Sequence, residues 1–251
     1  MSGDSPKVTL AQVRASFNRN IAEPWPLARV FRPLADLLTP LACNLGLSGN
    51  AVTGMRAAVA LAALPLLAAG QPALWPLAAL CAYLGYVLDC VDGNVVRVSD
   101  TASYWGKFID GLADGVFVYL APFAAGLGAW LAGHGVAFLV VGALTTVLAL
   151  FAQMTRTRLS FFREWMVGQS GAVDLAAAAR PARLEARALA LLVGASMATP
   201  LALLLPDGAA AYVLLAALTQ MPADATVIAT SLWQGSIMLR RWRRSIHASA
   251  G

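Results

Sequence analysis

Six long apolar stretches, separated by short connections, constrain this sequence more than any other feature. They cover residues 51–70, 73–97, 103–132, 135–157, 187–205 and 209–239. As a helix rising ~1.5 Å per residue, each can cross the ~30 Å hydrocarbon layer of a bilayer. Charged side chains make up 12% of the residues, against ~25% in soluble domains, which argues against a soluble enzyme. We predict an all-α, polytopic membrane protein with six transmembrane helices in one membrane domain, residues 50–244.

The Lys and Arg residues all fall on one side of this layout. The connections on the other side, at 70–72, 133–134 and 206–208, contain none of them. Because cytoplasmic loops are enriched in Lys and Arg, we predict that the N-terminal segment, 1–49, and the tail, 245–251, are cytoplasmic, with the protein in the inner membrane. The formal net charge of +5 then reflects topology and requires no nucleic-acid partner.

The N-terminal segment contains an amphipathic pattern. Apolar residues between Leu27 and Leu41 recur at helical spacing, while Arg29 and Arg32 lie on the other side of the helix. We predict an interfacial helix on the cytoplasmic leaflet, where the arginines meet anionic headgroups. Packing against the underside of the protein itself would produce the same pattern.

Neither a cleavable signal nor a disulfide framework is expected. Residues 1–49 lack a short apolar core followed by a small-residue cleavage site. The cysteines, Cys43, Cys81 and Cys90, are odd in number and lie in or near the apolar stretches.

Four aspartates lie at the end of the second apolar stretch and the beginning of the third. Asp89 and Asp92 are three residues apart, and Asp110 and Asp114 are four apart, so on helices each pair shares one face. Four uncompensated carboxylates would cost roughly 10–14 kcal/mol in a membrane. Because neither Cys nor His adjoins these aspartates, they suit Mg²⁺, Mn²⁺ or Ca²⁺. Two such ions would balance the four charges and suit phosphoryl chemistry.

Two neighbouring residues favour a phosphate ligand. Gly93 lets a ligand approach the backbone closely, and Arg97 adds a permanent cation about one turn further on. The structural alternative is that the aspartates pair only with Arg97 and Lys107, but two cations cannot balance four anions. The histidines, His134 and His247, are expected in the outer loop and the tail, away from the aspartates. If phosphoryl chemistry at this site needs a general base to accept a proton, we therefore expect an aspartate to serve.

These residues belong to a longer pattern that resembles a known motif. Its fixed positions here are Asp89, Asp92, Gly93, Arg97, Gly106, Asp110 and Asp114. In order and spacing they resemble the motif D-x2-D-G-x2-A-R-x8-G-x3-D-x3-D of the CDP-alcohol phosphotransferase family. Val96, where the family usually has alanine, is the one departure.

The resemblance implies transfer of a substituted phosphate from a CDP-linked donor, commonly CDP-diacylglycerol, to an alcohol, with release of CMP. It implies that the four aspartates bind two divalent cations, that Asp114 is the general base and that Asp110 belongs to the catalytic set. It also implies a homodimer. The nucleotide would be held by Asp89, Asp92, Gly93, Arg97 and Gly106.

Three weaker signals have alternative explanations. Asn50 and Thr53 resemble the family's Asn-x-x-Thr opening and could approach the nucleotide, or they could cap a helix. For Arg56, a snorkelling anchor is favoured over a phosphate contact. Gly111 and Gly115 form a Gly-x-x-x-Gly face that predicts close helix packing.

The acceptor is the least constrained part of the hypothesis. Arg156, Arg158 and Arg163 could bind an acceptor that carries phosphate, or they could be ordinary cytoplasmic anchors. Asp224 is isolated in the last stretch and has no assigned role.

We therefore predict phosphatidyl transfer from CDP-diacylglycerol to a small polar alcohol or alcohol phosphate. A CDP-alcohol donor acting on a lipid acceptor is an alternative. An ion-coupled transporter and an inactive scaffold are rivals from other classes.

Overall fold

The structure is a computed structural model that describes residues 7–17, 27–170, 187, 190, 194 and 197–249. Every regular element in these residues is helical. The α-helices are α1 (Leu10–Ser16), α2 (Arg32–Asn44), α3 (Gly49–Ala68), α4 (Trp75–Ser99), α5 (Tyr104–Ala129), α6 (Val136–Ser170) and α8 (Gly208–Ser249). Three short helical turns join them: η1 (Leu27–Phe31), η2 (Pro72–Leu74) and η3 (Trp130–His134).

Five of these helical segments are long and apolar enough to cross a membrane. They are Gly49–Ala68, Pro72–Ser99, Tyr104–His134, Val136–Trp165 and Gly208–Arg244. The all-α membrane fold predicted from the apolar stretches is thus confirmed. The predicted span 187–205 lies partly outside the described residues. Its described part includes a helical run at 197–203. The count of six spans therefore stays a prediction.

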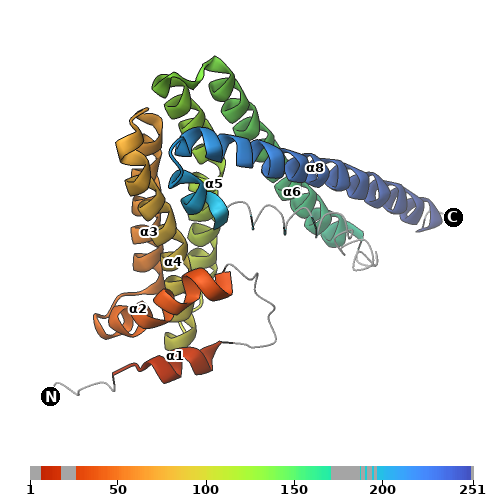
Figure 1. Ribbon diagram of the computed structural model, residues 1–251. Coiled ribbons are helices and arrows are strands. Elements are labelled where there is room, and N and C mark those ends of the chain that lie inside the picture. The colour runs from red at the N-terminus through yellow and green to blue at the C-terminus, as the bar shows by residue number, and fades with distance from the viewer. Residues whose placement is uncertain are drawn as a thin grey trace.

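Helices α3, α4 and α5 run side by side, α6 packs against α5, and α8 packs along α6 as the two diverge from the other helices (Figure 1). The main core lies between these helices and is built mostly from alanine. Its buried alanines include Ala60, Ala63, Ala78, Ala79, Ala82, Ala121, Ala124 and Ala125. Small side chains let helices approach closely, so van der Waals contact replaces the hydrophobic effect that lipid cannot supply.

Glycines bring backbones into contact at two helix pairs. A Cβ added at Gly128 of α5 would meet the backbone carbonyl of Leu67 in α3. Gly126 of α5 and Gly142 of α6 face one another in the same way. The close packing predicted at Gly111 is wrong for this chain, because a Cβ added there meets nothing within 4 Å.

The ends of α4 and α5 are fixed by local chemistry. Helix α4 ends at Asp100, which adopts the left-handed conformation with φ of 50°. Helix α5 begins after Ser103, whose hydroxyl accepts a hydrogen bond from the Gly106 amide at 3.0 Å. Such N-caps satisfy amides that have no partner within the helix. Because the connection is so short, the end of α4 stays beside the start of α5.

Helix α2 packs against the protein itself, which was one of the two explanations of the amphipathic segment. Ala35, Thr39 and Ala42 are buried as α2 packs against α4, while Leu37 and Leu41 are exposed. Exposed leucines on the outer face suit a membrane surface, and that location stays a prediction.

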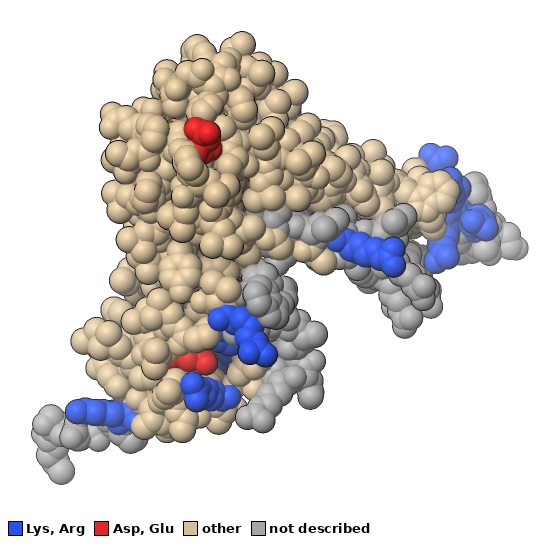
Figure 2. All heavy atoms as spheres, in the orientation of Figure 1, with Lys and Arg blue, Asp and Glu red and all other residues tan. Residues whose placement is uncertain are grey.

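Charged side chains are segregated along the molecule. Figure 2 shows Lys and Arg at the end that carries α1 and α2 and at the far tip of α8, with none at the opposite end in this view. There, His134 of η3 lies 3.5 Å from the Asp207 carboxylate at the start of α8. The predicted topology requires this segregation, although the side of the membrane stays a prediction.

The contact between α3 and α5 leads to a first prediction. Gly128→Ala should destabilise the protein by at least about 1–3 kcal/mol, because the new methyl group meets backbone that cannot rotate away. Thermal unfolding in detergent measures the effect. Gly54→Ala is the matched control, since a Cβ there meets nothing within 4 Å and the helix gains about 0.5–1 kcal/mol. Equal melting temperatures for the two variants would contradict the packing.

Candidate active site

Three of the four predicted aspartates converge where α4 ends and α5 begins. Asp89 and Asp92 lie on one face of α4, and Asp110 faces them from α5. Each offers a carboxylate oxygen that lies within 4.8 Å of the others. Asp92 is 6% exposed, whereas Asp89 and Asp110 are partly open. The side chain of Asp114, one turn after Asp110, lies outside the described residues, so its role stays a prediction.

Arg56 of α3 lies among these carboxylates. It is 4% exposed and forms an ion pair with Asp89. Its Nη1 lies 3.0 Å from Asp110 Oδ1 and 3.7 Å from Asp92 Oδ2, and its Nη2 donates to the Asp110 carbonyl oxygen at 2.8 Å. The favoured interpretation of Arg56 as a snorkelling anchor was therefore wrong. The missed signal was the successive three-residue spacing of Asn50, Thr53 and Arg56, which places neighbouring members of the series on one side of the helix.

The charges at this cluster do not balance within the described residues. Three carboxylates surround one guanidinium, which leaves two negative charges. Carboxylate oxygens are hard ligands, and one divalent cation would neutralise this excess. The donor set therefore fits a divalent metal. A second ion would require the Asp114 carboxylate, so the two-metal arrangement remains part of the hypothesis.

Thr53 and Asn50 face the cluster and the start of α5. The helix is capped by Ser48, whose side chain accepts from the Ala51 amide, so the capping alternative for Asn50 and Thr53 was wrong. Thr53 Oγ1 instead donates to Asp92 Oδ2 at 2.9 Å. Asn50 Oδ1 lies 2.8 Å from where a Cβ of Gly106 would be, so a side chain at this position would displace the Asn50 amide.

A cavity of about 540 Å³ opens beside Asp92 and Asp110. Every predicted nucleotide-binding residue except Asp89 lines it: Asn50, Thr53, Asp92, Gly93, Arg97 and Gly106. Lys107 adds a second cation to its wall. The unusual Val96 also lines it and packs against Gly49 where α3 meets α4.

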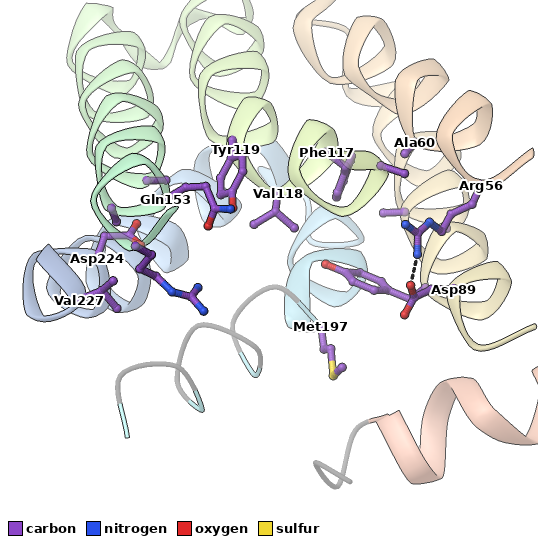
Figure 3. A pocket seen from close by; sticks show the side chains of 17 residues that line it. Arg56, Ala60, Asp89, Phe117, Val118, Tyr119, Gln153, Met197, Asp224 and Val227 are labelled. Carbon is purple, nitrogen blue, oxygen red and sulfur yellow. Dashed lines mark hydrogen bonds and ion pairs between the residues drawn. The ribbon is translucent and has the colours of Figure 1, made fainter. Parts of the chain in front are cut away.

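A second cavity, of about 370 Å³, reaches the cluster from another side. Asp89 and Arg56 stand at one end, and Asp224 and Gln153 stand at the other, beyond Phe117 and Val118 (Figure 3). The carboxylate cluster therefore borders two separate cavities, one reached by Asp92 and the other by Asp89.

A family model, CDP-alcohol phosphatidyltransferase, matches residues 47–222, which is more than half of the chain. The chain belongs to the CDP-alcohol phosphatidyltransferase family. The match begins just before α3 and ends within α8. It therefore includes the three aspartates, Arg56, all residues that line the first cavity and most of those that line the second. No curated protein matches the sequence. Family membership makes this a membrane transferase, and the family is one of metal-dependent enzymes of phospholipid synthesis that use CDP-alcohol donors.

The arginines predicted to bind the acceptor of this transferase do not converge. Arg156 lines the second cavity. Arg158 lines a different cavity, between α6 and α8, and Arg163 lines neither. Because α6 turns ~100° per residue, Arg158 faces away from Arg156, whereas Arg163 lies on nearly the same face as Arg156 but about two turns further along, beyond the cavity. Of the three, only Arg156 keeps a geometric basis as an acceptor ligand.

Arg97 is held by a hydrogen-bond network centred on the buried Asn94. Asn94 is 1% exposed and its Oδ1 accepts from Arg97 at 2.5 Å and from Arg32 at 3.2 Å. Its Nδ2 donates to Thr39 Oγ1 at 3.0 Å and to Asp36 Oδ1 at 3.2 Å. The network ties α2 to the nucleotide cavity. Arg32, expected at the headgroups, instead turns toward this network.

The position of Arg56 leads to a second prediction. Arg56→Gln should lower the melting temperature in chelator, because three carboxylates lose their shared counter-charge, at a cost of up to about 3 kcal/mol. Mg²⁺ should restore more stability to the variant than to the wild type, since the site becomes more negative. Arg241→Gln, an exposed change on α8, is the control. A smaller Mg²⁺ effect in Arg56→Gln than in wild type would contradict the arrangement.

The network around Asn94 leads to a third prediction. Asn94→Ala should destabilise the protein by about 2–4 kcal/mol, because it leaves buried donors and acceptors unpaired. It should also raise the KM for the CDP-linked donor, since Arg97 loses its anchor. Asn44→Ala removes hydrogen bonds to Val8 that lie at the surface and should change stability by less than about 1 kcal/mol. An unchanged donor KM in Asn94→Ala would contradict the positioning of Arg97.

Proposed function

We propose that the protein transfers the phosphatidyl group of CDP-diacylglycerol to a small polar alcohol, with release of CMP. The observation that carries the proposal is the placement of the carboxylate cluster between two cavities. The larger has Arg97 and Lys107 in its wall and suits a nucleotide diphosphate. The smaller offers a separate space for the acceptor. A site at the end of the helices would let acyl chains remain in lipid while the cytidine stays in water.

The chain's own residues would hold the donor in a fixed pose. Gly93 has no side chain and would let a phosphate approach α4 closely, and Arg97 Nη1 lies 3.3 Å from where a Cβ of Gly93 would be. Arg97, fixed by Asn94, would donate to phosphate oxygens. Thr53 orients the Asp92 carboxylate by its hydrogen bond. Such positioning converts the encounter of two substrates into an effectively unimolecular step.

The aspartates would supply the remaining chemistry. Asp89, Asp92, Asp110 and Asp114 would hold two cations, Mg²⁺ or Mn²⁺, which would withdraw charge from the phosphate and stabilise the departing CMP. Asp114 would accept the proton of the acceptor hydroxyl as its oxygen bonds to phosphorus and the bond to the CMP oxygen breaks. Arg56 would keep the carboxylates together between turnovers.

A CMP-release assay tests this function and gives the fourth prediction. The purified protein should release CMP from CDP-diacylglycerol with at least one alcohol of a panel when Mg²⁺ or Mn²⁺ is present, and release should stop in chelator. CDP-linked alcohols with diacylglycerol as acceptor form the second arm, which tests the reverse pairing of donor and acceptor. No release in either arm with metal present would overturn the enzyme assignment.

The same assay tests the general base. Asp114→Asn should abolish turnover, by at least about 100-fold, while thermal unfolding shows a folded protein. Asp100→Asn is the matched control, because Asp100 lies in the α4–α5 connection with a left-handed backbone that asparagine also tolerates. Near-normal turnover in Asp114→Asn would remove the assignment of Asp114 as the base.

A further inference from the structure

Asp224 of α8 is a buried acid that the family match does not explain. It lies beyond residue 222, where the matched segment ends. It is 3% exposed, and its Oδ2 has no hydrogen-bond partner among the residues that the structure describes. A charged side chain within a membrane helix costs about 2.5–3.5 kcal/mol even on a lenient scale, and such residues generally mark functional sites.

Asp224 stands at the end of the 370 Å³ cavity that lies away from the carboxylate cluster. Figure 3 shows it beside Val227, across the cavity from Asp89 and Arg56. Gln153 and Arg156 of α6 line the same end. Between the two ends the lining is apolar and includes Phe117 and Val118. The cavity thus has one polar end at the reaction centre and a second polar end on α6 and α8.

The charges at this second end restrict what can bind there. Among the described residues that line this end, Arg156 is the cation and Asp224 the anion, so the pair has no net charge to balance a phosphate monoester. The other guanidinium in the described lining, Arg56, already contacts three carboxylates. A carboxylate with an unused oxygen accepts hydrogen bonds from hydroxyl or ammonium groups. A phosphate placed beside Asp224 would instead be repelled.

We propose that Asp224 binds the head group of the acceptor and selects alcohols that present a hydrogen-bond donor, either a hydroxyl or an ammonium group, over phosphate monoesters. The inference rests on the proposed function, since it takes the second cavity as the acceptor site. The donor group of the acceptor contacts Asp224, and the cavity leads from there to the Asp89 end, where the reaction takes place. Gln153 and Arg156 bind the remaining polar atoms of the head group.

The test compares acceptor classes in wild type and in Asp224→Asn. The panel pairs amino alcohols, L-serine and ethanolamine, and polyols, glycerol and myo-inositol, with the phosphate monoesters glycerol 3-phosphate and inositol phosphate. Wild type should use an amino alcohol or a polyol best, and the ratio between these two classes identifies the donor group. Asp224→Asn should lower kcat/KM for the best acceptor by about tenfold or more, through KM, while the KM for CDP-diacylglycerol stays within about twofold.

A binding measurement separates failure of this inference from failure of the proposed function. At least one amino alcohol or polyol of the panel should raise the melting temperature of wild type and not that of Asp224→Asn, and this effect requires no turnover. Absence of CMP release with an Asp224-dependent temperature rise would overturn only the transfer reaction. Preference for a phosphate monoester, or an acceptor KM unchanged in Asp224→Asn, would overturn the role of Asp224.

Two further variants control for a nonspecific effect of the substitution and for loss of folding. Asp207→Asn makes the same chemical change at an exposed aspartate at the start of α8, near His134, and should leave acceptor KM unchanged. If Asp224→Asn does not fold, Asp224→Glu keeps the charge and moves it by one methylene. It should fold and shift the ranking of acceptors, and an unchanged ranking would count against the proposal.

Discussion

Mutual repulsion of carboxylates inside a membrane protein is the constraint on which the rest of this structure depends. Asp89, Asp92 and Asp110 lie close enough to bind one ion, and they could not remain so without a counter-charge. Arg56 provides part of it from a third helix. The close packing of α3 with α4 and α5 is therefore an electrostatic requirement of the site as well as a packing arrangement.

The sequence predicted the class of fold and the core of the site because both depend on regular spacing. Apolar runs long enough to span a bilayer indicated the helices, and the three- and four-residue intervals of the aspartates placed them on shared faces. Arg56 was misassigned because a lone cation near a helix end has the same pattern whether it points to headgroups or inward. Only the packing of α3 against α4 distinguishes the two. Asn94 was missed for a similar reason, since its partners in α2 are far away in sequence.

The acceptor side was the hardest to predict, and the reason is geometric. Arginines grouped in sequence at the end of α6 point to different cavities, whereas Asp224, isolated in sequence, reaches the cavity that borders the reaction centre. Contacts between α6 and α8 join residues separated by some seventy positions. No pattern within a short stretch of sequence indicates that such residues are neighbours. The nucleotide side was simpler because its residues come from consecutive helices joined by short turns.

The two cavities meet the carboxylates on different aspartates, Asp92 on one side and Asp89 on the other. An incoming hydroxyl and a departing nucleotide would then occupy opposite sides of the phosphorus atom. A single displacement in that arrangement inverts the stereochemical configuration at phosphorus. The placement of the two cavities would thus determine the configuration at phosphorus in the product, because each substrate would approach the phosphorus atom from its own cavity.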